Sequence, residues 1–383
     1  MHRVENNCIK ILFLIAFFIA QFIYAQKANV KTFYWKAYSH FGYIMQHRNS
    51  MGHLIKGHIY GAELNLSVPS YGRNGYEQEN NFPEKGAGFY WFNLANPDQL
   101  GHLFAIAPHY EIPLHHSVKK SRSYLRLSLG LGYVTKYFHP IDNHQNNVMS
   151  TPLNGFVNIK WLMKYDVSKR FRIDYGISLS HASNGKTSVP NLGINVGTLN
   201  LALVLKHLPK KTQAINFDHY IDSSSFKKSN HELFFNASYG YTAIYPVGTG
   251  NFLSQTYMLG YYRNVRNTHK FGGGLDIFYN PANKILVFNE DSLTISSGEN
   301  VQLGFKLGWA YNIGNISLPL EMGCYVKSFY KGDGIFYQRV GVRYYFKNDL
   351  FVSMTLKSHW ARADFFEYGI GYRFPVKKRG INN

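Results

Sequence analysis

A histidine and a serine two residues apart are the strongest candidates for catalysis in this chain. Residues 171–185 read FRIDYGISLSHASNG, so that His181 and Ser183 close an alternating apolar and polar segment. Residues two apart on a strand share one face, about 6 to 7 Å apart at the backbone. At that separation the imidazole can act as general base for the serine hydroxyl. The same pattern is also typical of a strand end followed by a Ser-Asn-Gly turn, so both interpretations stay open.

The segment that must hold this pair has one apolar and one polar face. The apolar face carries Phe171, Ile173, Tyr175, Ile177 and Leu179, and the polar face carries Arg172, Asp174, Ser178 and Ser180. In a membrane β-barrel the apolar face contacts lipid and the polar face lines the lumen. Continued alternation places His181 and Ser183 on the lipid side. Polar groups on that side are costly, which favours a functional role.

Segments with the same alternation of apolar and polar residues recur along the rest of the chain. Of its 383 residues 45% are hydrophobic and 17% aromatic, yet no run of 18 apolar residues follows the first 25. We therefore expect no transmembrane helix. Roughly sixteen segments of about ten residues alternate between apolar and polar instead, which predicts an all-β, antiparallel outer-membrane β-barrel. The pattern fits one barrel of about 14 to 16 strands or two related eight-stranded units.

Residues 1–25 are predicted to be a signal peptide. The basic residues Arg3 and Lys10 precede an apolar stretch over 11–22, and the small Ala25 follows it. This is the order of regions in a secretory signal. The expected location is the outer membrane of a Gram-negative cell, after removal of the signal.

The mature chain is strongly basic and holds one thiol, Cys324. The formal charge of +19 falls to about +18 without the signal peptide. A single thiol forms no internal disulfide. Because the chain is exported, its charge favours anionic lipid or lipopolysaccharide over nucleic acid as partner.

The chain divides into two similar halves. Phe41-Gly42-Tyr43 and Tyr239-Gly240-Tyr241 open them, and Ser180-His181 and Ser358-His359 lie near their ends. Duplication and shared barrel composition both account for this likeness. The predicted units are the signal peptide (1–25), a site-bearing barrel half (26–207), a polar linker (208–230), a second barrel half (231–374) and a basic tail (375–383).

The second half is not expected to carry a second site. Its apolar positions before His359 are even-numbered, from Leu350 to Leu356, so His359 falls on the polar, luminal face. No serine follows it at the matching position. Asp364 and Glu367 nearby are expected to be structural or luminal.

Residues 181–185 (HASNG), followed by 190–195 (PNLGIN), resemble the active-site segment of the lipid A 3-O-deacylase (PagL) family. The resemblance would extend over about residues 40–207. It implies an eight-stranded outer-membrane barrel with a membrane-facing Ser-His pair. It also implies an activity, the removal of an ester-linked acyl chain from lipid A.

The resemblance assigns roles residue by residue. His181 matches the base and Ser183 the nucleophile, while Asn184 and Asn191 match polar positions associated with the oxyanion hole. Asn195 occupies the position of the family's acidic triad member. The apolar leucines over 199–205 are odd-numbered, so Asn195 is expected to point to the same side of the barrel wall as His181. An asparagine can orient an imidazole but supplies no charge, and such a change lowers the rate of a serine protease about 10⁴-fold. We therefore expect a slower hydrolase, or one that uses a different carboxylate.

The predicted function is thus an outer-membrane serine esterase that carries out 3-O-deacylation of lipid A in the outer leaflet. The alternatives are a non-catalytic barrel, acting as a channel or structural protein, and an esterase of phospholipids. No cofactor and no metal is implied. His115-His116, His139 and His144 lack the regular spacing of metal ligands and are expected to be loop residues.

Overall fold

The computed structural model describes residues 32–115, 121–208, 231–291, 300–360 and 362–376. The predicted signal peptide, residues 209–230 of the predicted linker, His116 and the tail from 377 onward lie outside the described residues. Within the described part, no helix combines the length and the apolar character needed to cross a membrane.

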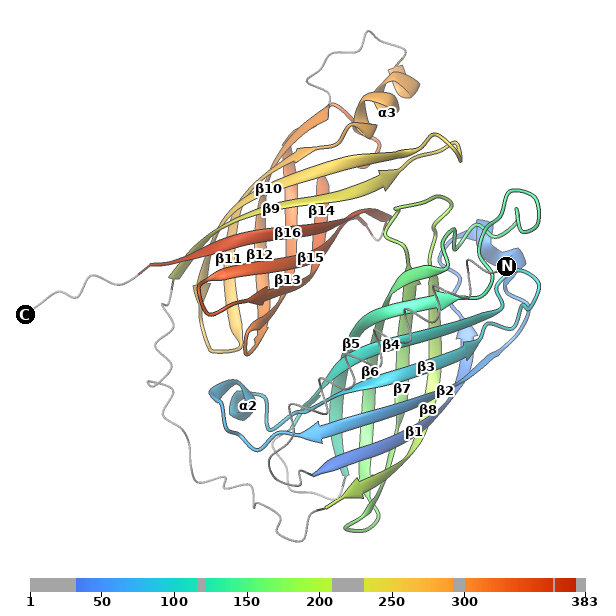
Figure 1. Cartoon of the computed structure of the whole chain (residues 1–383), viewed down its shortest axis with the longest axis vertical. Coiled ribbons are helices and arrows are strands. Elements are labelled where there is room, and N and C mark those ends of the chain that lie inside the picture. Colours follow the sequence, from blue (N-terminus) through green and yellow to red (C-terminus); the bar gives the residue numbers. More distant parts are fainter. Residues whose placement is uncertain (1–31, 116–120, 209–230, 292–299, 361, 377–383) are drawn as a thin grey trace, which may run out of the picture.

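The described strands form two closed antiparallel barrels of eight strands each (Figure 1). The first comprises β1 (Phe33–Ile44), β2 (Ile59–Pro69), β3 (Glu84–Asn93), β4 (His102–Pro113), β5 (Ser121–Val134), β6 (Leu153–Asp166), β7 (Phe171–Ser183) and β8 (Ile194–His207). The second comprises β9 (His231–Ala243), β10 (Asn251–Asn264), β11 (His269–Tyr279), β12 (Val301–Ile313), β13 (Ile316–Lys327), β14 (Phe336–Tyr345), β15 (Leu350–His359) and β16 (Arg362–Val376). The all-β expectation is confirmed as two eight-stranded units, and the alternative of one larger barrel is wrong.

Closure of the first barrel decides which connections lie near the candidate pair. Strand β1 pairs with both β2 and β8, so the end of β1 lies beside the start of β8. The connections 45–58, 94–101, 135–152 and 184–193 consequently gather at one end, which we call the loop end. The connection 45–58 contains the short 3₁₀ helix η1 (Asn49–Leu54).

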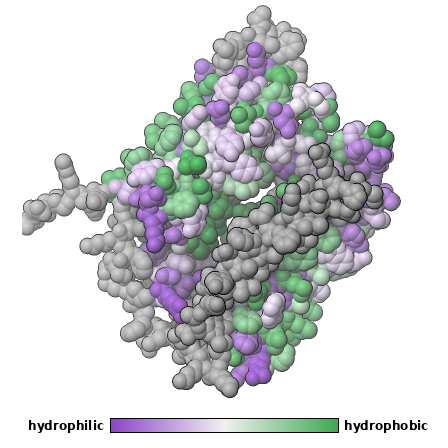
Figure 2. All heavy atoms as spheres, in the orientation of Figure 1, coloured by the Kyte–Doolittle hydropathy of each residue, from purple (hydrophilic) through white to green (hydrophobic). Residues whose placement is uncertain are grey.

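The outer walls of both barrels are apolar. On β8 the outward leucines Leu199, Leu201 and Leu203 are 55 to 71% exposed, while the intervening Ala202 and Val204 are buried. Figure 2 shows hydrophobic surface on both barrels. Such walls are stable only in contact with lipid, as expected for outer-membrane barrels.

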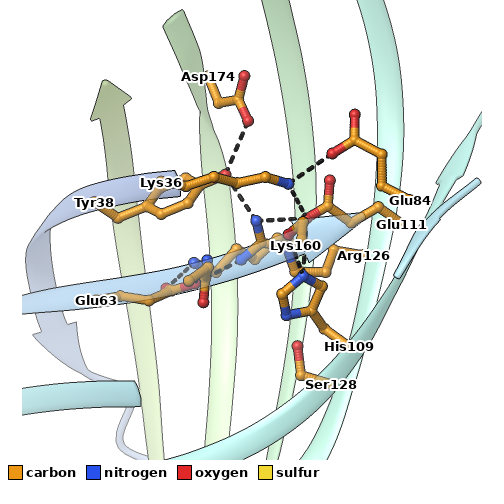
Figure 3. A network of polar contacts seen from close by, with 12 residues as sticks. Lys36, Tyr38, Glu63, Glu84, His109, Glu111, Arg126, Ser128, Lys160 and Asp174 are labelled. Carbon is orange, nitrogen blue, oxygen red and sulfur yellow. Dashed lines mark hydrogen bonds and ion pairs between the residues drawn. The ribbon is translucent and has the colours of Figure 1, made fainter. Parts of the chain in front are cut away.

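The lumen of the first barrel is filled by a network of buried charges (Figure 3). Arg126 lies at its centre, with Nη2 2.7 Å from Glu111 and Nη1 bonded to Glu63. Lys160 also pairs with Glu63, and Lys36 lies 2.7 Å from Glu111. These side chains are completely or almost completely buried, so they plug the barrel instead of lining an open pore.

Removal of Arg126 is expected to destabilise the first barrel strongly. Arg126→Met leaves Glu63 and Glu111 short of a buried positive partner, which costs about 3 to 5 kcal/mol. Arg122→Met is the matched control, because Arg122 pairs with Asp166 at 3.6 Å in a partly exposed position. Loss of such a pair costs at most about 1 kcal/mol. Denaturant unfolding of both variants in lipid vesicles measures the difference, and equal losses would contradict the account.

The two barrels contact each other at both ends. The helix α2 (Gly75–Glu79) lies opposite the loop end, and Glu79 accepts hydrogen bonds from Asn267 and Thr268 of the second barrel. At the loop end, the backbone N–H of Ala243 donates to the carbonyl of Lys186 at 2.8 Å. The second barrel therefore lies beside the first, with the end of β9 next to the connection 184–193.

Candidate active site

Strands β7 and β8 bring His181, Ser183 and Asn195 together. His181 and Asn195 are direct register partners, and His181 Nδ1 lies 2.7 Å from Asn195 Oδ1. The other ring nitrogen, Nε2, lies 3.0 Å from Ser183 Oγ. His181 continues the outward row that contains the exposed Leu179, as predicted. The three side chains therefore form one hydrogen-bonded chain on the outer side of the barrel.

Gly193 allows the connection 184–193 to close over this pair. Its φ is +76°, in the region that favours glycine. A Cβ there would lie 2.8 Å from His181 Cε1 and 3.2 Å from Ser183 Cβ. Gly193 falls within the segment that carried the resemblance, although no role was predicted for it. As a result Ser183 is only 6% exposed, although it lies on the outward face.

The two asparagines predicted to stabilise an oxyanion differ in their surroundings. Asn184 donates its side-chain amide hydrogens to Ser150 Oγ at 3.0 Å and to the carbonyl of Ser188 at 3.2 Å. Asn191 Oδ1 accepts the backbone N–H of Asn184 at 3.2 Å. No acceptor for Asn191 Nδ2 is found among the described residues. Asn184 thus holds the connection in shape, while Asn191 keeps a donor group available. Both oxyanion roles stay predictions.

His47 is a member of the site that sequence analysis missed. Its Nδ1 lies 3.1 Å from Asn195 Nδ2, and its Nε2 lies 3.0 Å from the carbonyl oxygen of Leu192. His47 is 148 residues from Asn195 in sequence and reaches it because β1 pairs with β8. No local pattern around residue 47 indicates this contact.

The predicted alternative of a different carboxylate finds no support in the described residues. There, neither ring nitrogen of His181 is hydrogen-bonded to an Asp or Glu side chain, because Asn195 and Ser183 occupy them. Likewise, no group of three or more His, Cys, Asp or Glu side chains in the described part is arranged to hold a metal ion.

His359 of the second barrel has a different environment. It is buried on the luminal face, as predicted, with Nε2 2.8 Å from the hydroxyl of Tyr325. Asp364 and Glu367 are also luminal and pair with Lys357 and Arg339. Among the described residues of the second barrel, no serine is thus hydrogen-bonded to His359.

Comparisons with known proteins divide the chain at the same place as the barrels. Residues 29–204 match the family model described as Lipid A 3-O-deacylase (PagL). Residues 231–378 match the model described as Acyloxyacyl hydrolase, C-terminal domain. No curated protein matches the chain.

Two solved structures illustrate the similarity to single barrels. The crystal structure of the outer membrane enzyme PagL is 15% identical, with 44% of this chain and 97% of that chain covered and a TM-score of 0.30. The crystal structure of Neisserial surface protein A (NspA) is 12% identical, with 46% of this chain and 100% of that chain covered and the same TM-score of 0.30.

Proposed function

We propose that the protein is an outer-membrane serine esterase, because residues 29–204 match the lipid A 3-O-deacylase (PagL) model and residues 231–378 match the model of acyloxyacyl hydrolase C-terminal domains. Its substrate is lipid A, from which it removes the ester-linked acyl chain at the 3 position. The observation that carries the proposal is the 3.0 Å contact between Ser183 Oγ and His181 Nε2 on the outer side of the barrel.

The reaction begins at this contact. Ser183 Oγ attacks the acyl carbonyl carbon while His181 Nε2 takes the hydroxyl proton. The carbonyl oxygen becomes an oxyanion, for which Asn191 Nδ2 is the candidate side-chain donor, with Asn184 holding the connection in shape. The bond between the acyl carbon and the sugar oxygen then breaks, and the sugar oxygen receives the proton from His181. An acyl-serine and 3-deacylated lipid A result.

Water completes the cycle. His181 takes a proton from water as the water oxygen attacks the acyl-serine carbonyl. Collapse of this second intermediate breaks the bond to Ser183 Oγ, which regains its proton from His181. The product is a free fatty acid. Because Asn195 supplies no negative charge to the imidazolium, the rate is expected to be lower than in a triad with a carboxylate.

The position of the site fits a membrane lipid as substrate. If the start of the first strand lies on the periplasmic side of the membrane, the loop end lies at the outer leaflet, where lipid A is found. The apolar outer wall then contacts the acyl chains of the substrate directly. The buried charge network inside the first barrel argues against the channel alternative for that barrel, because these side chains fill its lumen.

The test is an assay of purified protein with two kinds of lipid. Vesicles that contain lipopolysaccharide are expected to release one fatty acid per lipid A, whereas vesicles of glycerophospholipid alone release none. Release from glycerophospholipid vesicles at the same rate would contradict lipid A as the substrate while leaving the esterase chemistry intact.

A further inference from the structure

The side-chain amide of Asn195 can face His181 in two ways, and only one supports catalysis. With Oδ1 toward the ring, His181 Nδ1 carries a proton and Nε2 keeps the lone pair that accepts the proton of Ser183. With Nδ2 toward the ring, Nδ1 must accept a hydrogen bond. The proton then sits on Nε2, and His181 is no longer a base for Ser183. A wrong tautomer of this kind is the reason why amidation is so costly in a serine protease.

His47 determines which way the side-chain amide of Asn195 faces. The carbonyl oxygen of Leu192 only accepts hydrogen bonds, so the Nε2 of His47 beside it must carry a proton. In a neutral His47 the lone pair is then on Nδ1, which faces Asn195 at 3.1 Å. A lone pair attracts the amide Nδ2 and repels Oδ1. The amide oxygen is therefore directed toward His181, as the 2.7 Å contact requires.

We propose that His47 is a positioning residue that sets the direction of the hydrogen-bond chain from Leu192 to Ser183. It preserves the catalytic tautomer of His181 in a site whose acidic position has become an asparagine. This inference deepens the proposed function and depends on it for its effect on rate. It assigns a role to a residue in a connection remote in sequence from the Ser-His segment.

Three variants of the full chain test the proposal. His47→Ala removes the acceptor, and we expect kcat to fall about 10²-fold or more with little change in KM. His47→Gln keeps an acceptor for Asn195 and a donor for Leu192, so it is expected to stay within about tenfold of wild type. His53→Ala is the matched control. His53 also donates to a loop carbonyl, that of Gln145 at 2.9 Å, but contacts no member of the site.

The ¹⁵N chemical shifts of His181 provide a readout that needs no turnover. Wild type and His47→Gln are expected to carry the proton on Nδ1, and His47→Ala to show the other tautomer. If His47→Ala leaves both tautomer and kcat like those of His53→Ala, the proposal is wrong. If the tautomer changes as expected but wild type hydrolyses no lipid, the positioning role stands and the proposed function fails.

An independent observation concerns the second barrel, in whose described residues His359 is hydrogen-bonded to Tyr325 and not to a serine. The ring of Phe366, on β16, lies over the connection 184–193, and a Cβ at Gly185 would lie 2.3 Å from it. Gly185 has φ +64°, which favours glycine, and the ring of Phe366 leaves no room for a side chain there. Glycine is therefore needed both for the turn and for the contact with Phe366. The backbone bond from Ala243 to Lys186 holds the same stretch from β9.

We infer that the second barrel acts as a clamp that positions the connection 184–193 beside Ser183. Asn191, the candidate oxyanion donor, belongs to this connection. Displacement of a catalytic group by about 1 Å can cost about 10² in rate. The clamp gives the second barrel a part in the proposed reaction without any catalytic residue of its own.

Phe366→Ala tests the clamp, with Phe374→Ala as the control on the outward face of the same strand. Hydrogen exchange of the amides in 184–193 is expected to speed up about tenfold in Phe366→Ala only, with a lower kcat. Unchanged exchange would refute the clamp whatever the activity. Faster exchange in a protein that hydrolyses no lipid would support the clamp and refute the proposed function.

Discussion

Replacement of Ser183 with alanine is expected to abolish deacylation of lipid A, with a fall in kcat of at least about 10³-fold. The hydroxyl is the attacking group, and loss of the nucleophile in a serine protease with a full triad costs about 10⁶. The expected loss is smaller here because wild type lacks the carboxylate and starts from a lower rate. Fatty acid release from lipopolysaccharide vesicles measures the change.

A serine elsewhere on the outer wall provides the control for this variant. Ser39 on β1 is exposed and donates to the carbonyl of Leu201, far from His181 in the barrel wall. Ser39→Ala is expected to keep the wild-type rate. Equal activity of Ser183→Ala and wild type would contradict the assignment of the nucleophile.

The change Asn195→Asp is expected to raise kcat about tenfold to 100-fold. A carboxylate at this position supplies the charge that stabilises the His181 imidazolium, and charge-assisted hydrogen bonds are roughly twice as strong as neutral ones. The register pairing of β7 with β8 already places residue 195 within hydrogen-bond distance of the ring. Single-turnover rates of acyl transfer to Ser183 measure the effect on the chemical step.

Two further variants show whether the effect on rate comes from the charge at position 195 or from the orientation of the His181 ring. Asn195→Leu has a similar shape but no carbonyl, and it is expected to lose activity as His47→Ala does. In the Asn195→Asp background both carboxylate oxygens accept, so His47→Ala is expected to cost less than it does in wild type. An Asn195→Asp variant slower than wild type would contradict the account of the acidic position.

The barrel and the faces of its strands could be predicted because they depend on local alternation. The pattern over residues 171–183 separates a lipid face from a luminal face without reference to any other strand. For the same reason His359 could be assigned to the lumen of the second half. The pairing of His181 with Ser183 depends on a separation of only two residues, and it too was within reach of the sequence.

Other features depend on contacts across the closed barrel, and local patterns do not report them. His47 reaches Asn195 only because β1 closes on β8. The close approach of Gly193 to the ring of His181 depends on the course of a whole connection. Whether the sixteen strands form one barrel or two also depends on which strands pair to close each barrel. Each strand looks the same in either case, but β8 returns to β1 and β16 returns to β9.

The most direct test of the central claim is mass spectrometry of lipid A from a heterologous Gram-negative host. Cells would express wild type, Ser183→Ala or His181→Ala at matched levels in the outer membrane. The account predicts loss of one ester-linked acyl chain from lipid A in cells with wild type and no loss in the other two. Identical acylation of lipid A in all three strains would contradict it.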